Sequence, residues 1–191
     1  MTLACEAREA FWADPAAREG RSVPLVAASV GPYGATLHDG SEYRGNYGLD
    51  VDALVAFHRP RLAVLAAAGA DLLACETLPC RDEALALARV LPEFPQMQAW
   101  ISFSCRDDMH VSQGEPLAAC VDALEGCAQV AAVGVNCTAP QYIASLVEIA
   151  ASRTSKPIVA YPNSGERYDA VAMCWHGGAA AATLAEHASE W

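Results

Sequence analysis

Residues able to do chemistry follow directly on short apolar segments of this 191-residue chain. Glu76 comes after Asp71–Cys75, where an ionised carboxylate is costly unless it is paired. Cys137 comes shortly after Val130–Val135 and is a candidate metal ligand, since the thiolate is the form of cysteine that binds metals. We expect the ligand role for Cys137 because it stands at the end of a predicted strand. A buried apolar cysteine is the alternative.

Five further residues occupy comparable positions. Asn136 can orient a ligand or bond a substrate, although an asparagine at a strand end is equally often a turn former. Tyr33 and Gly34 can shape the wall of a pocket, because glycine permits a close approach of the backbone. Asn163 and Ser164 follow the last predicted strand, where turn and helix-cap chemistry accounts for much of the composition.

The elements that must position these residues alternate between apolar runs and helix-like stretches, which is typical of βα units. The predicted strands are Pro24–Val30, Asp71–Cys75, Gln98–Phe103, Val130–Val135 and Pro157–Ala160. The predicted helices between them are Val51–Ala68, Arg81–Val90, Pro116–Cys127 and Pro140–Ser152. Uninterrupted apolar strands indicate a parallel sheet that is covered on both faces.

Because the polar residues stand at the exits of five strands in one register, the pattern favours a partial (β/α)8 TIM barrel. A whole barrel needs about 250 residues and eight units. Leu3–Trp12 and Thr183–Trp191 read as helices at the two ends, so we expect residues 1–191 to be a single domain, the central part of a barrel. The first strands and the last strand are then missing. The two open sheet edges predict self-association, unless another chain covers them.

Composition and charge exclude several classes of protein. The chain carries 12 Lys plus Arg against 23 Asp plus Glu, a net charge of −11, whereas nucleic-acid binding relies on clustered basic residues. Its longest uncharged apolar run, Leu62–Ala70, is too short to cross a bilayer. Eight scattered cysteines indicate a reducing compartment. We therefore expect a cytoplasmic protein with no nucleic-acid or membrane partner.

Several groups of residues match one family in their order and in the lengths of the loops between them. They are Gly31-Pro32-Tyr33-Gly34, the loop Gly40–Tyr47, Ala74-Cys75-Glu76-Thr77-Leu78-Pro79, Gly134-Val135-Asn136-Cys137, and Tyr161–Ala170 with Trp175. Together they resemble the homocysteine S-methyltransferases, in particular the members that use S-methylmethionine or S-adenosylmethionine. The resemblance covers nearly the whole chain.

This resemblance implies a barrel enzyme in which zinc binds the thiolate of homocysteine, whose sulfur then attacks the methyl group of a sulfonium donor to give methionine. Coordination deprotonates a thiol that is mostly protonated at neutral pH. The resemblance also implies that Cys137 is one of three cysteine ligands of Zn2+ and that Glu76 receives the substrate's ammonium group. The other substrate-binding residues that it suggests are Tyr33, Gly34, Asn136, Asn163 and Ser164.

The sequence departs from the family at the other two zinc ligands, which are an adjacent pair in a Gly-Gly-Cys-Cys motif. No two cysteines are adjacent here, and Gly177-Gly178-Ala179-Ala180 does not replace the motif. A single thiolate does not hold a catalytic zinc ion. We therefore predict a homocysteine S-methyltransferase whose activity is impaired in this chain. The alternatives are a non-catalytic fragment or scaffold of such a barrel, or a lyase that uses Glu76 as a base.

Overall fold

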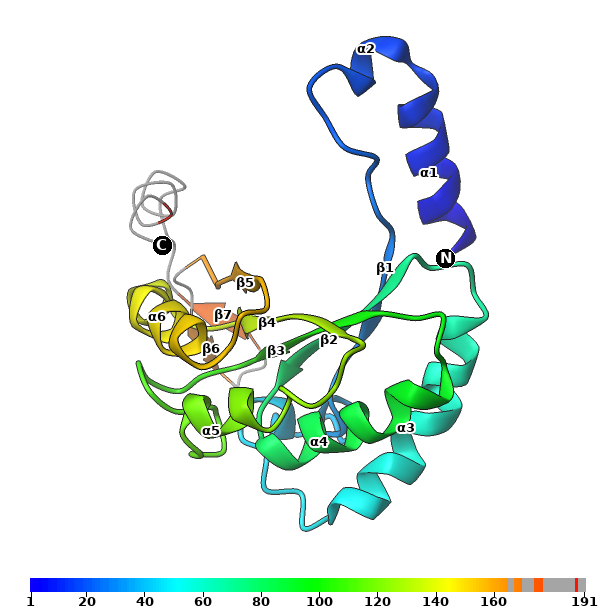
Figure 1. The fold of residues 1–191 in the computed structure, drawn as a ribbon. Coiled ribbons are helices and arrows are strands. Elements are labelled where there is room, and N and C mark those ends of the chain that lie inside the picture. Colours follow the sequence, from blue (N-terminus) through cyan, green and yellow to red (C-terminus); the bar gives the residue numbers. More distant parts are fainter. Residues whose placement is uncertain (165–166, 170–173, 177–187, 189–191) are drawn as a thin grey trace.

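A five-stranded parallel sheet forms the centre of the computed structural model, which describes residues 1–164, 167–169, 174–176 and 188 (Figure 1). The strands follow one another in space in chain order, and each pairs in parallel with the next. They are β1 (Ala27–Val30), β2 (Leu72–Leu78), β3 (Ala99–Phe103), β4 (Val130–Asn136) and β5 (Ile158–Tyr161).

Helices connect the strands and precede them. They are α1 (Thr2–Ala13), α2 (Pro15–Arg18), α3 (Val51–Ala66), α4 (Arg81–Val90), α5 (Leu117–Asp122) and α6 (Ile143–Arg153). Short 3-10 turns are η1 (Tyr33–Thr36), η2 (Ser41–Tyr43), η3 (Leu91–Glu93) and η4 (Pro140–Tyr142). An antiparallel pair, β6 (Arg167–Asp169) and β7 (Cys174–His176), follows the main sheet. Within the described residues no helix combines the length and apolarity needed to cross a membrane.

The strand order and the position of the helices distinguish a barrel segment from a doubly wound sheet. A doubly wound sheet reverses its strand order and carries helices on both faces. Here the order is sequential, and Figure 1 shows α3, α4, α5 and α6 following one face of the curved sheet. Since right-handed crossovers in a sheet that keeps one direction all lie on the same side, the other face becomes the interior of the barrel.

The core lies between that sheet and its helices. Alternate strand residues such as Cys75, Ile101 and Val133 are fully buried and belong to one apolar cluster with Leu87 of α4 and Leu146 of α6. We expected both faces of the sheet to be covered. Among the described residues, helices cover only one face of it. Polar residues point from the other face into the barrel interior, which is why the site lies there.

The predicted boundaries hold to within a few residues, with two informative exceptions. Strand β2 continues beyond Cys75 to Leu78, so Glu76 lies inside the strand and not after it. Helix α5 ends at Asp122, well before the predicted Cys127, and turns fill the rest of that segment. The predicted helix Thr183–Trp191 and the segment Gly177–Ala180 lie outside the described residues, apart from Ala188.

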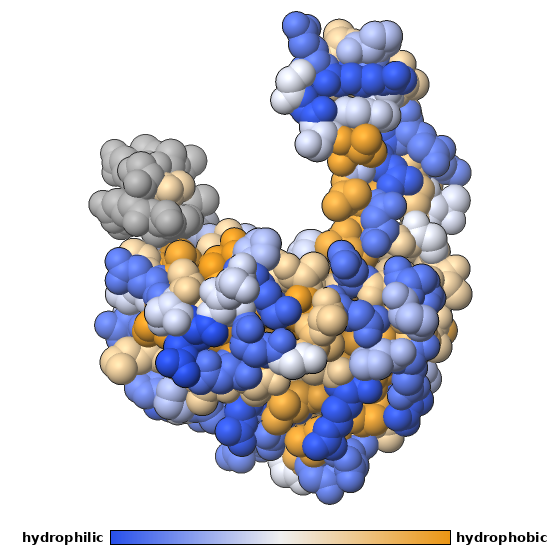
Figure 2. All heavy atoms as spheres, viewed as in Figure 1, coloured by the Kyte–Doolittle hydropathy of each residue, from blue (hydrophilic) through white to orange (hydrophobic). Residues whose placement is uncertain are grey.

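Helices α1 and α2 extend away from the sheet as an arm (Figure 1). Arg8 of the arm forms an ion pair with Asp71, whose carboxylate also accepts a hydrogen bond from the backbone N–H of Val26 at 2.7 Å. Val23 and Leu25, in the segment that joins the arm to the sheet, are exposed. Figure 2 shows apolar surface along this segment, on its left side in the view. The predicted self-association through the open sheet edges stays a prediction.

The close approach of β4 and β5 generates a test of the fold. A Cβ atom on Gly134 would lie 1.7 Å from the carbonyl oxygen of Val159, so alanine forces the two strands apart. We expect Gly134→Ala to destabilise the protein by about 1–3 kcal/mol or more, measured by urea unfolding. Gly126→Ala is the matched control, because a Cβ there meets no atom within 4 Å. Equal stability of the two variants would contradict the β4–β5 register.

Candidate functional site

Polar side chains from all five strands meet at the carboxyl ends of the sheet. Glu76 of β2 is half-buried in this group, and its two carboxylate oxygens have different partners. Ser29 of β1 donates to Oε1 at 2.6 Å, and the hydroxyl of Tyr161 on β5 donates to Oε2 at 2.8 Å. Because an ionised carboxylate accepts about four hydrogen bonds, Glu76 retains capacity for an ammonium group.

Tyr161 lies on β5, at the opposite edge of the sheet from Ser29, and binds the Glu76 carboxylate from there. Its hydroxyl oxygen accepts a hydrogen bond from Trp100 Nε1 at 2.9 Å and contacts Ser102 Oγ at 2.9 Å. Burial raises the pKa of Tyr161 well above its usual value, and the hydrogen bond to Glu76 raises it further. The phenol therefore stays protonated at neutral pH and remains a donor to Glu76.

Asn136 of β4 is the most connected side chain of the site and is 1% exposed. Its Oδ1 accepts hydrogen bonds from the backbone N–H of Thr77 and from Ser102 Oγ, both at 2.8 Å. Its Nδ2 donates to Thr77 Oγ1 at 2.8 Å and to Cys137 Sγ at 3.3 Å. All four hydrogen-bonding positions of the carboxamide are thus used within the protein, which is the arrangement of an orienting group.

Cys137 follows β4 with a φ of 48°, in the left-handed region. Its half-buried sulfur contacts Asn136 Nδ2 and also accepts from Thr77 Oγ1 at 3.6 Å. Four other cysteines are buried: Cys75, Cys80, Cys105 and Cys120. Burial raises the pKa of each of these four thiols to about 12, so they are protonated and inert at neutral pH. Cys137 is the cysteine that the fold brings to the strand ends beside Glu76.

Zinc chemistry fits Cys137 as one donor and not as a complete site. A soft sulfur at the rim of the sheet suits Zn2+, and a catalytic zinc site has three protein ligands. In the part of the chain that the structure describes, no three His, Cys, Asp or Glu side chains gather closely enough to hold a metal ion. The described residues therefore do not by themselves supply the three ligands of such a site.

Thr77 is a member of the site to which sequence reasoning assigned no role. It adopts a φ of 63°, which is rare for a β-branched residue. The pairing of β2 with β3 shifts here: Cys75 pairs with Ile101 and Leu78 with Phe103. Between these two pairs β2 advances by three residues and β3 by two, which is a β-bulge in β2. The sequence carries no glycine at the bulge, and so no signal for it.

Tyr33 and Gly34 lie in a different cluster. The ring of Tyr33 packs edge-on against Tyr47 at 5.3 Å and Phe57 at 5.0 Å between ring centroids. A Cβ on Gly34 would lie 2.5 Å from the backbone nitrogen of Glu42, so glycine is required for the loop to pack on itself. These contacts account for both residues structurally, and their substrate-binding role stays a prediction.

A buried hydrogen bond between His58 and Glu83 anchors that loop. The side chains of His58 on α3 and Glu83 on α4 are fully buried, with His58 Nε2 2.8 Å from Glu83 Oε1. The same carboxylate oxygen accepts a hydrogen bond from the backbone N–H of Tyr33. Burial, followed by the charge of Glu83, raises the pKa of Tyr47 above its usual value. The pair thus ties the loop after β1 to the helical layer.

Asn163 does join the strand-end group. Its backbone N–H donates to the carbonyl of Thr138 at 2.9 Å, next to Cys137. Ser164 follows and is exposed. The substrate-binding roles predicted for both residues stay predictions.

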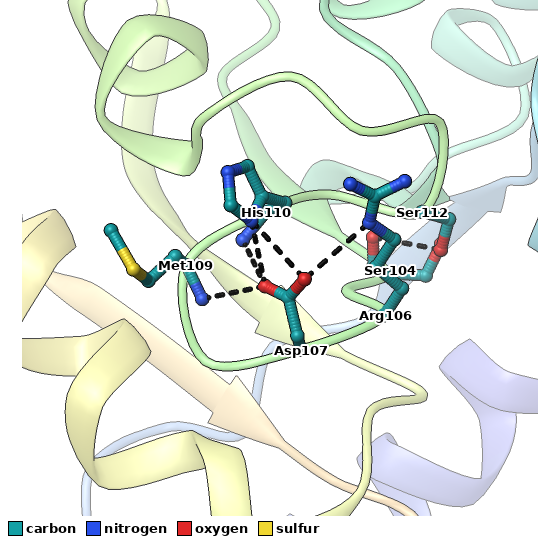
Figure 3. Close-up of polar contacts among 6 residues, drawn as sticks. All are labelled: Ser104, Arg106, Asp107, Met109, His110 and Ser112. Carbon is teal, nitrogen blue, oxygen red and sulfur yellow. Dashed lines mark hydrogen bonds and ion pairs between the residues drawn. The ribbon is translucent and has the colours of Figure 1, made fainter.

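The loop after β3 is held by Asp107 (Figure 3). This carboxylate accepts hydrogen bonds from the backbone N–H groups of Met109 at 2.9 Å and His110 at 2.7 Å. It also lies 3.0 Å from His110 Nδ1 and 3.4 Å from Arg106 Nε. Burial alone raises the pKa of Asp107, but these hydrogen bonds outweigh it and lower the pKa to about 2.

Comparisons with known proteins agree with this fold and identify the family. The sequence profile of the homocysteine S-methyltransferase family matches residues 1–189, so the chain belongs to that family of barrel proteins. It is 52% identical to homocysteine S-methyltransferase YbgG of Bacillus subtilis over 191 residues, all of this chain and 61% of that protein. The predicted family is therefore confirmed, and the chain spans about three-fifths of the length of this relative.

Solved structures give the same result for the fold. The oxidised form of the homocysteine methyltransferase MmuM from Escherichia coli aligns with a TM-score of 0.85 and 46% identity, over 100% of this chain and 59% of that chain. The metallated form of MmuM aligns with a TM-score of 0.80 and 51% identity, over 86% of this chain and 56% of that chain. The prediction of a partial barrel with about five parallel strands is confirmed.

The hydrogen bonds of Asp107 predict a pH dependence of stability. Because its folded pKa lies below the usual 3.8, its contribution is present above about pH 4 and is lost as the pH falls towards 2. The side chain is 37% exposed, so screening limits this contribution to about 1 kcal/mol or less. Urea unfolding should show Asp107→Asn less stable than wild type at pH 6 and equal to it near pH 2. Exposed Asp108→Asn is the control, and a deficit that is constant with pH would contradict the assignment.

Proposed function

We propose that the protein containing this chain is a homocysteine S-methyltransferase that moves a methyl group from a sulfonium donor to the sulfur of homocysteine, giving methionine. S-methylmethionine and S-adenosylmethionine are the candidate donors. One observation carries the proposal: a continuous chain of polar contacts, each 3.3 Å or shorter, leads from Glu76 through Tyr161, Ser102 and Asn136 to Cys137. The site thus joins a carboxylate for an amino acid to a sulfur donor for zinc.

Glu76 binds the ammonium group of homocysteine in this proposal. Ser29 and Tyr161 fix the two carboxylate oxygens before substrate arrives, which lowers the cost of ordering the carboxylate on binding. Because the phenol of Tyr161 stays protonated, it remains a donor that holds Oε2 of Glu76 in place. A net charge of −11 also favours the approach of a cationic sulfonium donor.

Cys137 contributes one ligand to Zn2+. When bound, zinc keeps the sulfur of homocysteine in its nucleophilic thiolate form and fixes its position. Asn136 and Thr77 hold the Cys137 sulfur from the protein side. Because this chain has no adjacent cysteine pair, we infer that normal activity requires ligands from a longer protein. The proposal assigns that protein to methionine biosynthesis in the cytoplasm.

Replacement of Cys137 tests the metal role. In the full-length protein, Cys137→Ala should lose stoichiometric zinc, measured by atomic emission, and lower turnover by at least about 100-fold, since a catalytic site then keeps only two protein ligands. Cys127→Ala is the matched control, because Cys127 is equally half-buried but precedes β4 at the opposite end of the strand. Wild-type zinc content and turnover in Cys137→Ala would reject the assignment. Turnover in zinc-free wild type would favour the lyase alternative.

Replacement of Glu76 tests substrate binding separately from the metal. Glu76→Gln keeps the shape of the side chain but removes the charge that pairs with ammonium, an interaction of about 1.5–3 kcal/mol. We expect the KM for homocysteine to rise about 10- to 100-fold with wild-type zinc content. Steady-state kinetics with homocysteine varied, together with a zinc assay, distinguish this result from general damage. An unchanged KM would remove Glu76 from the substrate site.

A further inference from the structure

We propose that Thr77 is a positioning residue that, together with Asn136, aims the sulfur of Cys137 into the barrel. The inference rests on the proposed function of Cys137 as a zinc ligand and extends it to the two residues whose side chains contact the Cys137 sulfur. Three observations support it, and they concern the backbone, the carboxamide of Asn136 and the contacts of the sulfur.

The first observation is backbone strain at two neighbouring strand ends. Thr77 and Cys137 both have left-handed backbones, with φ values of 63° and 48°. Such a conformation is unfavourable for a residue other than glycine, and it persists only where the surrounding structure imposes it. The two strained residues contact one another, with Thr77 Oγ1 3.6 Å from Cys137 Sγ. We therefore treat them as parts of one structural feature.

Strain at these positions changes which side chains face the interior. Successive residues of a regular strand point to opposite faces of the sheet. The bulge in β2 and the left-handed Thr77 allow both Glu76 and Thr77 to contact interior groups, Tyr161 for the first and Asn136 for the second. The left-handed Cys137 likewise lies on the same side as Asn136, with its sulfur 3.3 Å from the carboxamide. The carboxylate of Glu76 and the sulfur of Cys137 thereby join one network of polar side chains on the interior face of the sheet.

The second observation is that Asn136 clamps Thr77 with two reciprocal hydrogen bonds. The bulge removes the Thr77 N–H from the regular ladder, and Asn136 Oδ1 accepts it at 2.8 Å. Asn136 Nδ2 in turn donates to Thr77 Oγ1 at 2.8 Å. Since buried hydrogen bonds stabilise the conformation that forms them, these two bonds offset the backbone strain at Thr77.

The third observation is that the Cys137 sulfur has two donors, Asn136 Nδ2 and Thr77 Oγ1. Hydrogen bonds to a ligand atom fix its orientation and tune its donation to a metal, and loss of such a partner typically lowers metal affinity 10- to 100-fold. The hydroxyl of Thr77 donates to sulfur while it accepts from Asn136. Valine has the shape of threonine but can do neither.

The decisive comparison is Thr77→Val with Thr77→Ser in the full-length protein. We expect Thr77→Val to bind zinc at least about 10-fold more weakly in a chelator competition without substrate. After substitution with Co2+, its sulfur-to-cobalt absorption band should shift. Thr77→Ser restores the hydroxyl, so it should recover zinc affinity to within about threefold together with the wild-type band. Wild-type zinc affinity and an unshifted band in Thr77→Val would overturn the proposal.

Two further variants separate positioning from stability. Ser104→Ala removes another buried hydroxyl at the end of β3, which bonds to Ser112 and not to the sulfur, and should leave zinc affinity and the cobalt band unchanged. If Thr77→Val does not fold, Thr77→Ala gives the same test without a branched side chain. Loss of zinc affinity in Ser104→Ala as well would overturn the proposal. Absence of zinc binding through Cys137 in wild type would instead reject the proposed function.

Discussion

The strand-end site depends on the four hydrogen bonds of one buried carboxamide. Asn136 connects the bulge in β2, the serine of β3 and the sulfur that follows β4. Because a carboxamide that lost these partners would be left unsatisfied in a buried position, at a cost of about 1–3 kcal/mol for each group, the three strand ends keep one relative position. An apolar side chain of the same size fills the space but specifies no such geometry.

The same network explains how one cysteine among eight acquires a chemical role. Residue type is identical at all eight positions, yet burial keeps Cys75, Cys80, Cys105 and Cys120 as inert thiols with a pKa of about 12. Cys137 differs because it is only half-buried and two donors face its sulfur. Position in the fold, and not composition, therefore distinguishes a candidate ligand from a small apolar core residue.

Much of the fold and part of the site followed from the sequence. Apolar runs marked all five strands of the sheet, and the family motifs identified Glu76, Asn136 and Cys137 as neighbours before any contact was known. Thr77, Ser102 and Tyr161 were not assigned roles, because threonine, serine and tyrosine near strand ends are common and carry no distinctive signal. The structure links Tyr33 and Gly34 to the cluster of Tyr47, Phe57 and Glu83, which no local pattern indicated.

The sequence by itself determined the alternation of strands and helices, the family and the acidic charge, because periodicity and composition are local properties. Only the tertiary structure decided which side chains join one network. That outcome depends on the register between β2 and β3 and on two left-handed residues, Thr77 and Cys137. A bulge of one residue reverses the direction of every side chain beyond it, and its cost is balanced by Asn136, which lies 59 residues from Thr77 in the chain.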